Sequence, residues 1–295
     1  MTILDAVSGT GMISRRQCKP MNELIIEAGR GERHYWADLW KYRELFFFLS
    51  WRDILVRYKQ TVIGILWALI RPLLIIVIGT VIFSKMTGTS PDNLPYAVLI
   101  CAATLPWQFF ASAMSESSNS LIANSNMISK IYFPRIIVPA SAVIVSFSDL
   151  LISLVILAGV MLWYHVWPTG RLVTLPLFTA LAFFASFGVG LWLSALNVRY
   201  RDFRYVIPFI VQFGIFISPV FFTTAKFHEK HSELACRLYD LNPMVAVIDG
   251  YRWALGDNVA FNFTGLLTSL VVTALLLVSG VKYFRATEKS FADII

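Results

Sequence analysis

Long apolar stretches separated by short polar connections run along most of this chain. A helix needs roughly 20 apolar residues to cross the hydrocarbon core of a bilayer. Six stretches approach or exceed that length, and they cover residues 61–84, 94–114, 136–163, 172–197, 206–222 and 263–281. Arg71 and Asp149 are the charged residues within them. The pattern predicts an all-α membrane protein with six transmembrane helices over residues 61–285.

The basic residues in the connections predict how these helices are oriented. Cytoplasmic connections of membrane proteins carry an excess of Lys and Arg. The side that holds both termini carries 18 of these residues, whereas the opposite connections carry 6. We therefore expect both termini in the cytoplasm, with cytoplasmic tails over residues 1–39 and 286–295.

Residues 40–60 precede the first predicted span and have the pattern of an amphipathic helix. The apolar face of this helix comprises Phe47, Trp51, Ile54, Leu55 and Tyr58, and the charged side chains fall elsewhere. A helix of this kind lies at the membrane interface. It either anchors the first span alone or also clasps a cytosolic partner.

Two polar segments between the spans are candidates for contacts outside the hydrocarbon core. Residues 115–135 are rich in Ser and Asn and are predicted as a cytoplasmic loop that docks to another protein, with room for one short helix whose apolar stripe is Leu121, Ile122, Met127 and Ile128. Residues 223–262 are predicted as an outer gate region with two short helices, the first near residues 228–240. Asn242 and Pro243 suit the start of the second helix, and Gly256 suits its end. This second helix is expected to be amphipathic, with Val245, Ile248 and Trp253 opposite Asp249 and Arg252.

Composition and motifs argue against a soluble protein and against an enzyme. Apolar residues make up 57% of the 295 residues and charged residues 15%, compared with about 25% charged residues in soluble domains. The net charge is +7, but the basic residues follow the predicted topology, so no nucleic-acid surface is indicated. The sequence lacks GxxxxGKS/T, GxSxG and HExxH motifs. Cys18, Cys101 and Cys236 lie far apart, so we expect no metal, no cofactor and no catalytic residues.

Five segments, in the order of the predicted spans, carry a resemblance to a known family. They are RDILVRYKQTVIGILWALIRPL (52–73), SKIYFPR (129–135) with Pro139, NVRYRDFRYVIPFIVQFGIFISPVFF (197–222), NPM (242–244) with Arg252, and FRATEKSFADII (284–295). Over about residues 40–295 the chain resembles the membrane permease subunit of the ABC-type polysaccharide exporters, which export O-antigen, capsule or teichoic acid.

The resemblance implies a transport subunit of the bacterial inner membrane. Two copies would form a homodimeric channel, and two copies of a separate ATP-binding ABC subunit would dock on its cytoplasmic side. The substrate would be a polysaccharide linked to undecaprenyl pyrophosphate, with O-antigen as the first choice of glycan. The docking residues that the resemblance implies are Ser129, Lys130, Tyr132, Phe133, Arg135, Arg201 and Asp202, and the outer gate residues are Asn242, Pro243, Asp249 and Arg252.

Other classes of membrane protein stay open as alternatives. An ABC permease for teichoic acid, capsule, small lipids or drugs shares the architecture. An ion-coupled secondary transporter would have inverted repeats and more ionisable residues within its spans. A membrane glycosyltransferase would need acidic or His side chains at one depth, whereas Asp149 is the single acidic residue of the spans.

Aromatic side chains are the candidates for contact with sugars, because the apolar faces of sugars stack on rings. Phe209, Phe213 and Phe216 share one face of the fifth span, and Gln212 lies beside them. Trp67 of the first span is a further candidate for the channel lining. The alternative is that these rings contact lipid or pack within the bundle.

Arg71 is the basic residue within the spans, where an unpaired charge costs a few kcal/mol. It either pairs with Asp149, which is predicted at a comparable depth, or faces the channel and meets the pyrophosphate. In the fourth span, small residues recur every four positions, and they are Ala182, Ser186, Gly190 and Ser194. This stripe predicts close packing against another helix.

Overall fold

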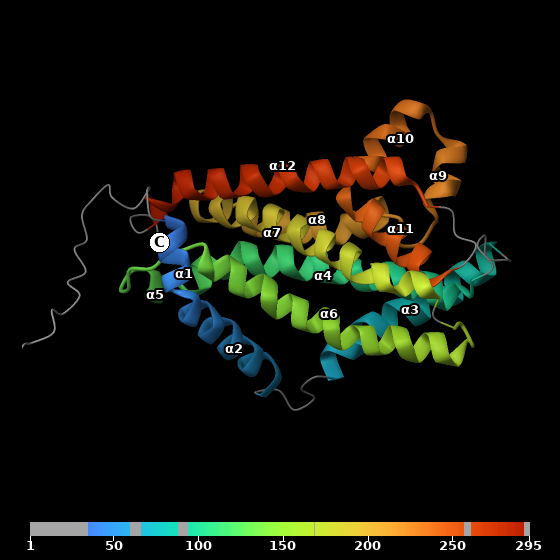
Figure 1. Cartoon of the computed structure of the whole chain (residues 1–295), viewed down its shortest axis with the longest axis horizontal. Coiled ribbons are helices and arrows are strands. Elements are labelled where there is room, and N and C mark those ends of the chain that lie inside the picture. The colour runs from blue at the N-terminus through green and yellow to red at the C-terminus, as the bar shows by residue number, and fades with distance from the viewer. Residues whose placement is uncertain (1–34, 60–65, 88–93, 168, 257–260, 292–295) are drawn as a thin grey trace, which may run out of the picture.

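The structure is a computed structural model that describes residues 35–59, 66–87, 94–167, 169–256 and 261–291. Every regular element within these ranges is a helix (Figure 1). The helices are α1 (Tyr35–Lys41), α2 (Arg43–Lys59), α3 (Leu66–Thr87), α4 (Tyr96–Ala123), α5 (Ser125–Ile128), α6 (Ile137–Trp163), η2 (Gly170–Thr174), α7 (Leu175–Arg199), α8 (Phe203–Ile217), α9 (Thr224–Lys230), α10 (Glu233–Asp240), α11 (Pro243–Leu255) and α12 (Phe263–Glu288). The predicted all-α class is therefore confirmed for the described residues.

Each of the six predicted spans overlaps one helix. Four helical segments are long and apolar enough to cross a membrane, and they are α4, α6, the continuous segment Gly170–Arg199, and α12. They run along the long axis of the molecule (Figure 1). The apolar parts of α3 and α8 are shorter, covering Leu69–Ile82 and Phe203–Ile217. The chain is therefore a multi-pass membrane protein built around four long helices.

Small residues bring the long helices close together. The predicted stripe of the fourth span is buried along its length in α7 and packs on α4. A Cβ atom added at Gly190 of α7 would lie 2.6 Å from the Oγ atom of Ser117 of α4. The close approach of the two helices therefore leaves room only for glycine at residue 190. On the other side of α7, a Cβ atom added at Gly280 of α12 would lie 2.6 Å from the carbonyl oxygen of Gly188. The packing role predicted for the stripe is confirmed.

The polar segment predicted as a loop over residues 115–135 is helical up to Ala123, as a continuation of α4, and again in α5. Its serines do not break the helix, because their hydroxyls donate to carbonyl oxygens one turn earlier. Ser118 donates to Ser115 at 2.7 Å, and Ser120 donates to Ser117 at 2.7 Å. The loop prediction was wrong here because the segment continues α4 along α7, and serine hydroxyls such as those of Ser118 and Ser120 bond within the helix itself.

The region between α8 and α12 also differs from the prediction. The single helix expected near residues 228–240 is divided into α9 and α10. Asn242 caps α11 as expected, since its side chain accepts a hydrogen bond from the Met244 amide at 3.0 Å. The polar side of α11 is covered as well as its apolar side, because this helix is enclosed by α4, α7 and α12, and Arg252 is only 3% exposed.

Both predicted tails contain helical residues where they adjoin the rest of the chain. The five residues before position 40 belong to α1, and the chain after residue 286 completes α12 and then buries Phe291. Residues 1–34 and 292–295 lie outside the described part of the chain. The helix predicted over residues 40–60 is present as α2, and Figure 1 shows it lying oblique to the long helices.

Candidate functional site

The aromatic face of α8 points away from the packed bundle. Phe209, Phe213 and Phe216 are 59%, 47% and 64% exposed, and the ring centroids of Phe209 and Phe213 are 4.2 Å apart. Gln212 is exposed beside them. The opposite face is packed, because a Cβ atom at Gly214 would lie 2.5 Å from the Trp107 ring. The predicted residues thus share one accessible surface, which we call the α8 aromatic face.

Arg71 does not form the predicted pair with Asp149. The Asp149 carboxylate lies 3.2 Å from the Nη2 atom of Arg57 and accepts a hydrogen bond from Tyr58, both on α2. The prediction was wrong because α2 packs along α6 and brings its own basic residue to the acid. Arg71 is exposed on α3, and the side chain of Trp67 lies outside the described residues.

The contacts of Arg57 tie the end of α2 to two long helices. Its Nη2 atom also lies 3.5 Å from the Oε1 atom of Glu116 on α4. Burial and the neighbouring Asp149 carboxylate raise the pKa of Tyr58 to about 12, so its hydroxyl remains a donor at neutral pH. Asp149 is near the midpoint of α6, and α2 therefore reaches well along that span. The sequence pattern gave no signal for this contact.

The segment after α5 exposes some of the predicted docking residues and buries others. Ser129 and Lys130 are exposed, and Ile131 and Tyr132 are each 58% exposed. We call residues 129–132 the docking tip. Phe133 is buried instead, in a cluster that contains Ile128, Val198 and Phe291.

The remaining predicted docking residues lie on either side of that cluster. Arg135 is half-buried, and its contacts are with Glu288 at the end of α12. Arg201 and Asp202 are exposed on the corner between α7 and α8, directly after Val198 of the buried cluster. The structure thus brings the two exposed sets to the same end of the molecule, while Phe133 and Arg135 face inward.

Two of the predicted outer gate residues hold the chain that leaves α8. The Arg252 guanidinium donates to the carbonyl oxygens of Phe222 at 2.9 Å and Val220 at 3.1 Å. The Asn242 side chain donates to the Oγ atom of Ser218 at 3.2 Å. Residues 218–222 are thereby fixed to α11 by side chains as well as by packing.

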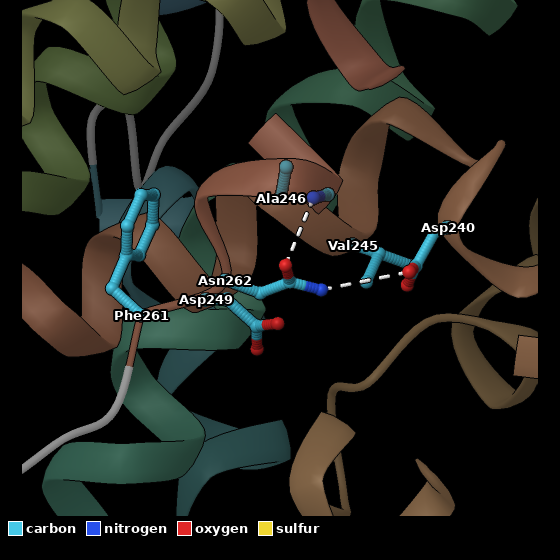
Figure 2. Close-up of a pocket in the computed structure, with 7 residues that line it drawn as sticks. Asp240, Val245, Ala246, Asp249, Phe261 and Asn262 are labelled. Atoms are coloured by element: carbon cyan, nitrogen blue, oxygen red, sulfur yellow. Dashed lines mark hydrogen bonds between the residues drawn. The ribbon is translucent and has the colours of Figure 1, made fainter. Parts of the chain in front are cut away.

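A small pocket lies where α10, α11 and the start of α12 meet (Figure 2). Its lining is mixed and consists of Asp240, Asp249, Asn262, Val245, Ala246, Phe261 and Gly265. Asn262 accepts from the Gly265 amide at 3.0 Å and donates to Asp240 at 3.5 Å. The Oδ1 atom of Asp240 also lies 3.2 Å from the Nε2 atom of His228. Burial raises the pKa of Asp249 to about 6, and this effect outweighs the opposing charge of Arg252.

No group of three or more His, Cys, Asp or Glu side chains is placed to hold a metal ion among the residues that the structure describes. Cys101 and Cys236 are free thiols, and Cys18 lies outside the described residues.

Comparison with known proteins gives a consistent result. Residues 44–255 match the ABC-2 type transporter family. The chain is 22% identical over 258 residues to a Myxococcus xanthus protein named O-antigen export system permease protein RfbA. The aligned region covers 88% of this chain and 98% of that relative. A Klebsiella pneumoniae protein of the same name is 28% identical over 245 residues, covering 83% of this chain and 92% of the relative.

Proposed function

Because this chain belongs to the ABC-2 type transporter family, we propose that it is the membrane subunit of an ATP-driven exporter of a lipid-linked polysaccharide. It is a multi-pass permease of the bacterial inner membrane, similar over most of its length to O-antigen export permeases. O-antigen linked to undecaprenyl pyrophosphate is the proposed substrate. A separate ABC subunit, bound in two copies, would hydrolyse the ATP.

The proposed topology has six spans with both termini in the cytoplasm. One buried cluster contains Leu49 of α2 and Phe291, which follows α12, so the described segments before the first span and after the last span lie at the same end of the bundle. An even number of crossings produces this arrangement. With 22 residues, α3 extends about 33 Å at 1.5 Å per residue, which is enough to cross the hydrocarbon core.

The observation that carries the proposed transport path is the accessible aromatic row on α8. In a homodimer, the α8 aromatic faces of two copies would line a channel together with Gln212, Trp67 and Arg71. Stacked rings offer weak and repeated contacts to sugars, and a long polymer can leave such contacts as readily as it enters them. Asn242, Pro243, Asp249 and Arg252 would form the outer gate, in which Asn242 and Arg252 fix the chain segment that leaves α8.

The experiment replaces rings on this face and measures export. Phe209→Ala and Phe213→Ala are expected to reduce surface polysaccharide, and the double variant is expected to reduce it further. The matched control is Phe263→Ala, which removes a 70% exposed ring from α12. Protein amount in the membrane and co-purification with the ATPase should stay at the parent level. Equal export by the double variant and the control would show that the α8 rings contact lipid instead.

A further inference from the structure

The carboxyl group of Glu288 contacts the chain at Arg135, three residues after the docking tip. Its Oε1 atom accepts a hydrogen bond from the Arg135 amide at 2.6 Å. The Arg135 guanidinium in turn donates to the main-chain carbonyl oxygen of Glu288. Residues 153 positions apart are thus joined twice, once through each backbone. Such a pair fixes both the position and the direction of the chain at Arg135.

Helix α1 completes the surroundings of this carboxylate. The phenol of Tyr35 lies within electrostatic reach of both Glu288 and Tyr132. Burial, reinforced by the Glu288 carboxylate, raises the pKa of Tyr35 above its usual range, so the phenol stays neutral. The Arg285 guanidinium lies 4.5 Å from the centroid of the Tyr35 ring. Burial raises the pKa of Glu288 in spite of the opposing effects of Arg135 and Arg285. The Glu288 carboxyl group therefore lies among two arginines and a neutral hydroxyl.

Apolar packing next to the Arg135–Glu288 pair also restricts the position of the docking tip. Phe133 follows the docking tip directly and is 3% exposed. It shares a buried cluster with Phe284 and Phe291, whose ring centroids are 5.4 Å apart in an edge-to-face arrangement. The tip is thus flanked by two buried side chains, Ile128 before it and Phe133 after it, and the hydrogen-bonded Arg135 follows two residues later.

We propose that Glu288 is a positioning residue that orients the docking tip toward the ATP-binding subunit. The inference rests on the proposed function, because it takes the tip as the contact with that subunit. Through its bond to the Arg135 amide, Glu288 would transmit forces on the tip to α12, a helix that runs the length of the bundle (Figure 1). The C-terminal end of α12 is then part of the coupling between ATP hydrolysis and the membrane helices.

The first measurement needs only the permease. A nitroxide label on Tyr132→Cys, with Cys18, Cys101 and Cys236 replaced by alanine, reports the mobility of the tip in the full-length protein. We expect Glu288→Ala to shorten the correlation time of the label at least twofold. Glu288→Gln keeps an oxygen acceptor for the Arg135 amide and should restore most of the immobilisation. The matched control is Glu233→Ala, which removes an exposed ion pair on α10.

A correlation time that is unchanged in Glu288→Ala would overturn the proposal. If that variant does not accumulate, the same label mobility is measured in Glu288→Asp, because the shorter aspartate side chain cannot reach the Arg135 amide equally well. Parent-like mobility in Glu288→Asp contradicts the proposal, and a mobility between those of the parent and a freely moving label supports it.

The second measurement separates this proposal from the assignment of docking itself. Cysteine at residue 132 is cross-linked to cysteines on the ATPase surface, in the complex of both full-length subunits. Absence of cross-links in the parent would contradict docking at the tip. Cross-links that form in the parent and fall severalfold in Glu288→Ala, but not in Glu288→Gln, support the positioning role. Equal cross-linking in the parent and in Glu288→Ala overturns it.

Discussion

At the scale of single residues, charged side chains in this protein are used to fasten one helix to another. Asp149 holds α2 against α6, and Arg252 holds the chain after α8 against α11. Buried charge is costly unless it is paired or hydrogen-bonded. Each of these residues has several partners, so the loss of one such side chain leaves groups on another element unsatisfied.

The Asp149 contact leads to a stability prediction. Asp149→Ala removes the partner of both Arg57 and Tyr58, and we expect it to lower the free energy of unfolding by about 1 to 3 kcal/mol, between the values for exposed and fully buried pairs. Arg57→Ala should have a similar effect, whereas Arg71→Ala should have little. Thermal unfolding of the purified protein in detergent measures these changes. A large effect of Arg71→Ala with none from Arg57→Ala would contradict the observed pairing.

Asp249 leads to a prediction of pH dependence. Its pKa is raised from 3.8 to about 6 in the folded protein, where Arg252, Asp240, His228 and Thr224 are the groups that act on it. A carboxyl with a raised folded pKa contributes stability that is lost as the pH rises through that pKa. Ionised Asp249 should therefore destabilise the folded protein fully above about pH 7. This destabilisation should disappear as the pH falls from about 6 to 4 and the carboxyl group becomes protonated.

The test of this dependence compares the parent with Asp249→Asn. The side chain of the variant cannot ionise at residue 249. At pH 8 the free energy of unfolding of the variant should therefore exceed that of the parent by about 1 to 3 kcal/mol, and its unfolding temperature should be higher. Near pH 4 the two proteins should differ little. A parent that gains stability relative to Asp249→Asn as the pH rises would contradict the assignment.

At the scale of elements, close helix crossings depend on glycine. At the α7–α12 crossing a Cβ atom on Gly188 would lie 2.9 Å from backbone atoms of Leu276 and Leu277, which cannot rotate away. The same crossing is approached from the other side by Gly280. Helices in lipid associate through such packing, because apolar surface alone gives no advantage over lipid contact.

Alanine substitution of these glycines should therefore have effects that depend on position. Gly188→Ala and Gly280→Ala should each cost about 1 to 3 kcal/mol through overpacking. Gly159→Ala is the matched control, because nothing lies within 4 Å of a Cβ atom added there. We expect this variant to be neutral or slightly stabilising, since alanine favours the helix over glycine. Equal thermal stability of all three variants would show that the crossing tolerates a methyl group.

The sequence predicted the helices of the membrane bundle better than their contacts. Runs of apolar residues and the Asn242–Pro243 start signal identify helices because they depend on local chemistry alone. Contacts such as those of Arg57 with Asp149 and of Arg135 with Glu288 join distant segments, and no periodicity in the sequence encodes them. The serine-rich end of α4 was misassigned for a related reason. Serine favours a loop in water, but it is accommodated in a helix whose neighbour packs closely.

At the scale of the whole molecule, a single copy leaves polar groups on the outside of the bundle. Arg71 and Gln212 are exposed on α3 and α8, and both of these helices pack against α4. A polar or charged side chain that faces lipid near the middle of the bilayer costs up to a few kcal/mol. A second copy that covers this side would place these groups in a wet channel, as the proposed homodimer requires.

This arrangement predicts contact between the α8 aromatic faces of two copies. With the native cysteines replaced by alanine, Phe216→Cys should form disulfide-linked dimers in native membranes under mild oxidation, because a face that lines a narrow channel is close to its counterpart. Leu267→Cys is the matched control, since this 65% exposed residue lies on α12. Solubilisation in detergent before oxidation should abolish disulfides that form by random collision in the membrane. Disulfides between the two copies of a stable dimer should remain. Efficient linking at residue 267 with none at residue 216 would place α12, and not α8, between the two copies, and the aromatic row would then face lipid.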